Sequence, residues 1–169
     1  MTTLPESDLI LPRAGRAIRR LLATGFGAGY LPRAPGTFGT LVGVPIAWLL
    51  AGLPFAPHAA AILVLFAAGL PLCGGLAREL GRHDPREIVW DEVVGLQFAL
   101  FFSARNLEFY VLGFMLFRLF DIMKPPPLTG LERLPGGIGI MADDVGAGVY
   151  AALVLAMVHW WLVRTSSGV

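Results

Sequence analysis

Acidic residues interrupt the apolar sequence of this chain at three places. Asp91 and Glu92 are adjacent in HDPREIVWDEVVG, Asp121 lies in FRLFDIMKPPP, and Asp143 and Asp144 are adjacent in GGIGIMADDVGAG. Only 15% of the 169 residues are charged, whereas 56% are hydrophobic. Each carboxylate must therefore be solvated, paired or bound to a cation where it meets the apolar phase. These five acids are the residues whose positions most need a chemical reason.

A divalent cation would explain why so many acids occur in an apolar chain. Carboxylates a few ångströms apart in a dry site repel one another strongly, so they need a counter-charge. Oxygen ligands without histidine or cysteine favour Mg²⁺, or Mn²⁺ as an alternative, over zinc. Adjacent residues on a helix point about 100° apart, so each adjacent pair predicts one metal ligand and one group that supports it. The pattern leaves open which member is the ligand.

Two cations flank one of these acids at helical spacing. Arg118, Asp121 and Lys124 recur every third residue, which predicts that they share one face of the last turns of a helix. Arginine and lysine beside a metal are suited to binding phosphate. The sequence therefore predicts a phosphate clamp next to the acids.

A glycine-rich loop is a second candidate for binding phosphate. Residues 25–40, GFGAGYLPRAPGTFGT, contain five glycines and two prolines, so we expect no regular helix before about Thr37. The loop lacks the strand of a dinucleotide fingerprint and the Gly-Lys-Ser/Thr of a P-loop. If Thr37 caps the next helix, backbone N–H groups near Gly36 and the Arg33 side chain could still meet an anion. The alternative is a flexible re-entrant connector.

The chemistry that these residues favour is hydrolysis of a phosphate ester. Neither serine nor cysteine is paired recognisably with a base, so attack by metal-activated water is favoured, and an aspartyl-phosphate route stays open. In this hypothesis, three acids hold the cation: Asp143, Asp144 and Asp121. Either Asp91 or Glu92 completes the ligand set or orients the water. The phosphate is bound by Lys124, Arg118 and Arg33.

Composition places these residues in an integral membrane protein. The mean hydropathy is +0.69, above the usual range of soluble domains. The net charge of +1, without a basic stripe interleaved with aromatics, argues against nucleic acid as a partner. A single cysteine, Cys73, rules out a disulfide framework, and no second ligand at zinc spacing accompanies it.

We expect three parts along the chain. Residues 1–24 form a tail and an amphipathic helix over 13–23, whose arginines either lie on anionic headgroups or anchor the next helix. Residues 25–164 form one helical membrane domain, and 165–169 a short tail. The helix that carries Asp91 is expected to start at Asp84-Pro85, and the last helix is expected to start at Asp143-Asp144. The PPPL segment is expected to adopt a polyproline conformation. Apolar helices are expected at 38–55, 58–77, 93–102, 109–120 and 145–163.

The distribution of basic residues predicts the orientation. If the N-terminus is cytoplasmic, the apolar segments cross the membrane five times. If the short third and fourth segments do not cross completely, about four to five helices are transmembrane or partly embedded. Only Arg105 and Arg164 then lie opposite to the cytoplasmic face, as the positive-inside rule requires. All five acids fall on the cytoplasmic side, so we expect one site at that face. The basic residues on the cytoplasmic side are Arg13, Arg16, Arg19, Arg20, Arg33, Arg78, Arg82, Arg86, Arg118, Lys124 and Arg133.

Four blocks, GFGAGYLPRAPGTFG, HDPREIVWDEVVG, FRLFDIMKPPP and GGIGIMADDVGAG, together resemble the phosphatidylglycerophosphatase A family, in the family's order and over most of residues 25–148. The resemblance implies an all-helical, Mg²⁺-dependent phosphatase of the bacterial inner membrane. It would remove the phosphate monoester from phosphatidylglycerophosphate at the cytoplasmic face. The family's polar positions fall on Asp91, Glu92, Arg118, Asp121, Lys124, Asp143 and Asp144, with Pro35, Gly36 and Thr37 in the glycine loop.

Two other functions remain to be weighed. A transporter would place its acids along a path near the middle of the membrane, whereas these lie at the ends of apolar segments. A lipid-head phosphotransferase of the CDP-alcohol type would need a spaced Asp and Gly-Ala-Arg signature, which the chain lacks. The oligomeric state is open.

Overall fold

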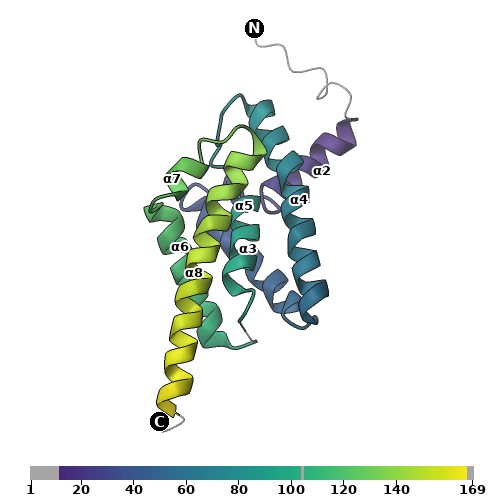
Figure 1. Ribbon diagram of the computed structural model, residues 1–169. Helices are drawn as coiled ribbons and strands as arrows, with labels where there is room; N and C mark the ends of the chain where they lie inside the picture. The colour runs from purple at the N-terminus through teal and green to yellow at the C-terminus, as the bar shows by residue number, and fades with distance from the viewer. Residues whose placement is uncertain (1–11, 104, 167–169) are drawn as a thin grey trace.

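The computed structural model describes residues 12–103 and 105–166 and shows only helices over that part of the chain (Figure 1). The all-helical prediction is confirmed there. In order, the elements are α2 Arg13–Ala23, the short 3₁₀ helix η1 Ala28–Tyr30, α3 Pro35–Leu50, α4 Phe55–Leu80, α5 Trp90–Leu100, α6 Leu107–Met123, α7 Leu128–Leu131 and α8 Gly137–Ser166.

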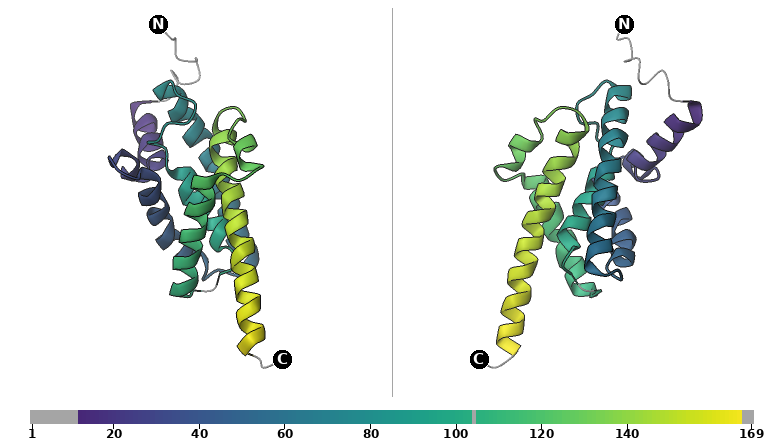
Figure 2. Two further views of the ribbon diagram at one scale, coloured as in Figure 1. Left: turned by 90° about the vertical axis from the view of Figure 1, so that its left-hand side faces the viewer. Right: turned by 45° about the vertical axis from the view of Figure 1, so that its right-hand side comes forward.

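The short helix α5 lies at the centre of the bundle. It contacts α3, α4, α6 and α8, and nine of its 11 residues are buried. The long helix α8 packs along it, and its C-terminal part extends beyond the other helices (Figures 1 and 2). Side chains at the start of α5 are consequently surrounded by protein.

The backbones of α5 and α8 touch because both helices carry glycine at the crossing. A Cβ added to Gly148 would lie 2.3 Å from the carbonyl oxygen of Gly95, closer than any side chain can approach. Small residues allow such close packing between apolar helices. The crossing at Gly95 and Gly148 therefore brings the acids on the two helices together.

The outer surface of the bundle is apolar. The helices α4 and α8, of 26 and 30 residues, are long and apolar enough to cross a bilayer, and only 33% and 22% of their most apolar stretches are buried. Leu63 and Leu153 on these helices are 60% and 56% exposed, and Met115 on α6 is 61% exposed. The helices α3, α5 and α6, with 16, 11 and 17 residues, are shorter than the roughly 20 residues that a full crossing needs. For these three helices, membrane embedding stays a prediction.

Two predicted helix starts are wrong by a few residues. The first helix after the glycine loop starts at Pro35, with Ala34 and not Thr37 in the capping position, because the fixed φ of proline suits a first turn. The helix that carries Asp91 starts at Trp90 and not at Asp84-Pro85. Residues 85–88 instead form a turn in which the Ile88 N–H donates to the Pro85 carbonyl at 2.9 Å.

Two predictions near the last helix are also wrong. The prolines of PPPL form a turn, in which the Leu128 N–H donates to the Pro125 carbonyl at 2.9 Å, and α7 follows directly. The helix α8 starts at Gly137, well before Asp143 and Asp144. Gly137 packs against the backbone of α4, where a Cβ would meet the Leu70 carbonyl oxygen at 2.0 Å. Gly137 therefore lets the start of α8 pack closely against α4.

Candidate active site

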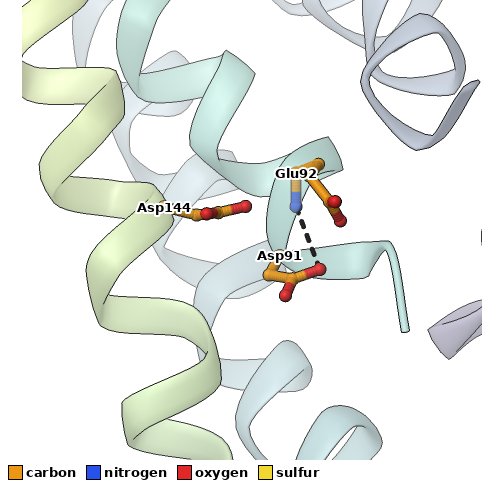
Figure 3. Close-up of side chains that lie close together, drawn as sticks. All are labelled: Asp91, Glu92 and Asp144. Carbon is orange, nitrogen blue, oxygen red and sulfur yellow. Dashed lines mark hydrogen bonds between the residues drawn. The ribbon is translucent and has the colours of Figure 1, made fainter. Parts of the chain in front are cut away.

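Three carboxylates from two helices converge beside the glycine crossing, two of them buried and that of Glu92 half-buried. One carboxylate oxygen from each of Asp91, Glu92 and Asp144 lies within 4.8 Å of the others, and Figure 3 shows the three side chains turned toward one another. Asp91 and Asp144 are only 7% and 4% exposed. We call these three residues the acidic trio.

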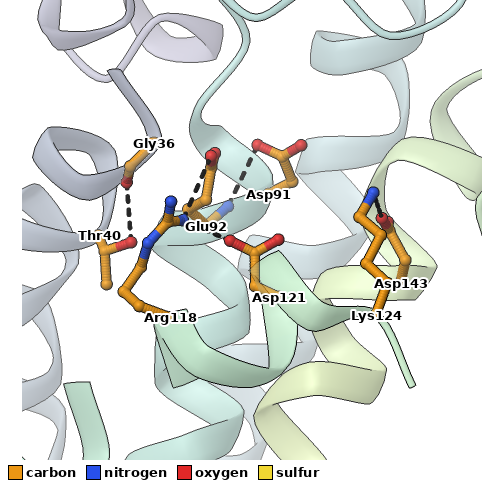
Figure 4. A network of polar contacts seen from close by, with 8 residues as sticks. All are labelled: Gly36, Thr40, Asp91, Glu92, Arg118, Asp121, Lys124 and Asp143. Carbon is orange, nitrogen blue, oxygen red and sulfur yellow. Dashed lines mark hydrogen bonds and ion pairs between the residues drawn. The ribbon is translucent and has the colours of Figure 1, made fainter. Parts of the chain in front are cut away.

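Next to the acidic trio, α6 contributes an ion pair. The Arg118 guanidinium contacts the Asp121 carboxylate, and its Nη1 lies 3.7 Å from Oε1 of Glu92 (Figure 4). Gly36, in the first turn of α3, closes this side of the site. A Cβ there would lie 2.2 Å from Glu92 Oε1 and 3.0 Å from Arg118 Nη1. Only glycine lets α3 come this close to both side chains.

A second cation approaches from the end of α6. Lys124 Nζ lies 2.8 Å from Oδ2 of Asp143 and 3.1 Å from Oε2 of Glu132. Burial alone would lower the pKa of Lys124, but the hydrogen bonds and charges of Asp143 and Glu132 outweigh it and raise that pKa above its ordinary value. Lys124 therefore carries a positive charge at the site over the whole physiological pH range.

These groups surround one cavity of about 350 Å³. Arg33 is exposed and, like Thr37, is not among the described residues that line the cavity, so their role in binding phosphate stays a prediction. Asp84 and Arg86 also line the cavity but were not predicted as site residues. Their place in the same block as Asp91 is the signal that could have found them. The predicted site residues around the cavity are Pro35, Gly36, Asp91, Glu92, Arg118, Asp121, Lys124, Asp143 and Asp144.

The acidic trio offers a donor set that a hard cation would satisfy. Oε2 of Glu92 and Oδ2 of Asp144 are buried and lack a hydrogen-bond partner in the described part of the chain, as does Oδ1 of Asp143. Buried ionised oxygens without a partner are costly, and an oxygen-only site suits Mg²⁺ or Mn²⁺. Asp121 and Asp143 are instead paired with cations. That Asp121 and Asp143 also hold the cation stays a prediction.

Comparison with known proteins gives matches over most of the chain. Residues 21–159 match the family described as Phosphatidylglycerophosphatase A. The Escherichia coli protein of that name is 38% identical over 83% of this chain and 84% of its own length. The Haemophilus influenzae protein of the same name is 38% identical over 85% of this chain and 90% of its own length.

A third relative carries a different name. A Bacteroides thetaiotaomicron protein, provisionally named a phosphatidylinositol-3-phosphatase, is 40% identical over 83% of this chain and 92% of its own length. No solved structure gives a significant match. The match over residues 21–159 covers all four sequence blocks and the whole cavity. On this evidence, the chain belongs to the phosphatidylglycerophosphatase A family.

Proposed function

We propose that this protein hydrolyses the phosphate monoester of phosphatidylglycerophosphate, giving phosphatidylglycerol and phosphate, with Mg²⁺ held by Asp91, Glu92 and Asp144. The family membership and the names of two relatives support the substrate. One observation supports the chemistry most strongly: two buried carboxylates, the half-buried carboxylate of Glu92 and two ion-paired cations line a single cavity.

The balance of charge supports a requirement for a cation. Asp91 and Asp144 have no ion-pair partner in the described part of the chain, and Glu92 has only Arg118, at 3.7 Å. Arg118 and Lys124 are each already in closer contact with another acid. A phosphate monoester, which carries a charge of about −1.5 to −2 at pH 7, would be repelled from such a cavity. A divalent cation on the trio removes this repulsion.

The protein's own residues bind and orient the substrate in this proposal. Arg118 offers planar N–H donors that suit phosphate oxygens, and Lys124 offers a compact charge from the opposite side. Asp121 and Asp143 hold these two cations in position before substrate enters. A bound Mg²⁺ would polarise a phosphoryl oxygen and lower the pKa of a water ligand.

The membrane setting is also a proposal. The apolar outer surface and the two long helices support a multi-pass protein of the bacterial inner membrane. The distribution of arginines supports a cytoplasmic site. Ile122 is 71% exposed and also lines the cavity. A diacyl substrate could therefore keep its chains against apolar side chains while its terminal phosphate enters.

The direct test is phosphate release by the purified full-length protein in neutral detergent micelles that contain phosphatidylglycerophosphate. We expect release with excess Mg²⁺, a lower or equal rate with Mn²⁺, and none with EDTA until Mg²⁺ is restored. Asp144→Asn is the matched inactive control. Turnover that persists in EDTA would refute the metal role, and an inactive protein under all these conditions would refute the proposed reaction.

The Bacteroides relative justifies a second substrate in the same assay. Phosphatidylinositol 3-phosphate also presents a phosphate monoester on a lipid headgroup, but on a bulky ring. We expect the glycerol headgroup to be preferred, because Arg118 and Lys124 approach the 350 Å³ cavity from two sides and leave limited space. Faster turnover of the inositol lipid would reassign the substrate without changing the reaction.

A further inference from the structure

A second cavity lies away from the acidic trio, between α2, η1 and the C-terminal part of α4. Its volume is about 450 Å³, and among the described residues it shares no lining residue with the cavity of the acidic trio. The helix α2 lies obliquely beside α4 at this end of the molecule (Figures 1 and 2). We call this cavity the α2 groove, and its polar lining consists of Arg13, Arg16, Arg20, Thr24, Tyr30 and Glu79.

The described residues that line the α2 groove carry a net positive charge. Glu79 is the one acid among them, and Arg19 and Arg20 both contact it, Arg19 at 3.0 Å. Arg13 and Arg16 have no ion-pair partner in the part of the chain that the structure describes. They leave the groove with an excess of positive charge that an anion could neutralise.

Exposed apolar side chains lie on the elements that form the groove. Leu21 on α2 lines the groove and is 50% exposed, while Ile18 on α2 and Phe26 in the following loop, which are not among the lining residues, are 58% and 60% exposed. Tyr30, which lines the groove, is 56% exposed. A small soluble anion would use only the arginines, whereas a phospholipid would also cover these apolar side chains. Arginines beside exposed apolar residues therefore fit a lipid with an anionic head.

The α2 groove is fixed to the segment that leads into the active site. The Val89 N–H donates to the carbonyl oxygen of Ala23 at the end of α2, at 2.9 Å. Gly29 in η1 packs against the backbone of Glu87, where a Cβ would meet the carbonyl oxygen at 2.0 Å. A lipid bound in the groove would thus lie against the framework that positions α5, without entering the cavity of the acidic trio.

We propose that the α2 groove binds the phosphate of an anionic phospholipid, with Arg13 and Arg16 as its main contacts and the acyl chains over Ile18, Leu21 and Phe26. This site is separate from the proposed substrate site and requires no turnover. It also decides between the two roles open to the N-terminal helix, since α2 acts as a lipid-binding element and not only as a cationic anchor.

Native mass spectrometry of the full-length protein in neutral detergent tests the proposal. The probes are dioleoyl phosphatidylglycerol, dioleoyl phosphatidylcholine and soluble glycerol 1-phosphate. We expect retention of phosphatidylglycerol in preference to phosphatidylcholine. The double variant Arg13→Gln/Arg16→Gln should weaken phosphatidylglycerol binding at least about tenfold, since each basic residue near anionic headgroups contributes on the order of 1 kcal/mol. The matched control is Arg164→Gln, because Arg164 is an exposed arginine at the C-terminal end of α8.

Three results would overturn the proposal. Equal weakening by Arg164→Gln would mean that bulk charge explains the effect. Unchanged binding in the double variant, with a loss in Arg118→Gln, would place the lipid in the cavity of the acidic trio. Displacement of phosphatidylglycerol by an equal concentration of glycerol 1-phosphate would make the groove a site for soluble phosphate esters.

A measurement on the unaltered protein guards against misfolding of the double variant. When the salt concentration of the buffer is raised from about 50 to 500 mM, the protein should retain less phosphatidylglycerol but as much phosphatidylcholine as before, because salt screens exposed charges. Salt-independent retention of phosphatidylglycerol would contradict an arginine-based site. Neither measurement depends on phosphatase activity, so failure of this proposal would leave the proposed reaction untouched.

Discussion

The substitution Gly36→Ala tests how precisely the Glu92 carboxylate must be positioned for catalysis. A Cβ at this position would lie 2.2 Å from Glu92 Oε1, whereas real Cβ atoms essentially never come closer than 3.0 Å and rarely closer than 3.4 Å. The Glu92 carboxylate would therefore have to move by between about 0.8 and 1.2 Å. The contact is with the end of a side chain and not with backbone, so the fold can absorb it. A misplacement of this size at a catalytic group can cost on the order of 10²-fold in rate.

We therefore expect Gly36→Ala to lower kcat for phosphate release by roughly 10²-fold while the melting temperature in detergent changes little. Gly130→Ala is the matched control, because a Cβ at Gly130 meets nothing within 4 Å. It should keep full activity. If Gly36→Ala turns over substrate like the unaltered protein, the position of Glu92 does not matter for catalysis. If it melts many degrees lower, the effect is on the fold and the reasoning fails.

Three further substitutions separate metal binding, packing and phosphate binding. We expect MgCl₂ to raise the melting temperature of the unaltered protein but not that of Asp144→Asn, which should also release phosphate at least about 10²-fold more slowly. If Mg²⁺ still stabilises Asp144→Asn, Asp144 does not belong to the metal site. Gly148→Ala should destabilise the protein by about 1–3 kcal/mol, measured by thermal unfolding, because its Cβ would meet the Gly95 backbone at 2.3 Å; an unchanged melting temperature would show that the two helices can separate without cost. Lys124→Gln should raise KM about tenfold or more, since it removes a charged hydrogen bond worth about 1.5–3 kcal/mol. Lys124→Arg keeps the charge and should have a KM between those of Lys124→Gln and the unaltered protein. Equal KM values in these three proteins would show that Lys124 does not bind the phosphate.

Much of the fold follows from local sequence. The predicted N-terminal helix coincides with α2, Arg13–Ala23, because arginines and apolar residues alternate there at helical spacing. The ends of α5 and α8 do not follow from local sequence, since contacts with distant segments set them. Ala23 accepts the hydrogen bond from Val89, the residue before α5. The helix α8 begins as early as Gly137, whose backbone packs directly against α4.

The convergence of the acids could be predicted, but their division into groups could not. Spacing placed Arg118 and Asp121 on one helical face, and they do form an ion pair. The partner of Lys124 is Asp143, on another helix, and no spacing along the chain encodes that choice. Because Lys124 contacts Asp143, the adjacent Asp144 points about 100° away and is left for the acidic trio. The two members of the pair thus have different surroundings: Asp143 pairs with Lys124, and Asp144 lies beside Asp91 and Glu92.

The two ion pairs of the site, Arg118 with Asp121 and Lys124 with Asp143, offer a reason why a phosphate monoester should bind better than the diester product. Arg118 and Lys124 already contact Asp121 and Asp143, so an incoming phosphate must compete with a carboxylate for each cation. A monoester carries a charge of about −1.5 to −2 at pH 7 and three terminal oxygens, enough to engage two cations that approach from different sides. The phosphate left in phosphatidylglycerol is a diester with one negative charge and two free oxygens. If the acidic trio holds Mg²⁺ as proposed, the diester has fewer oxygens than the monoester with which to contact both cations and the metal, so we expect the product to compete poorly with the substrate.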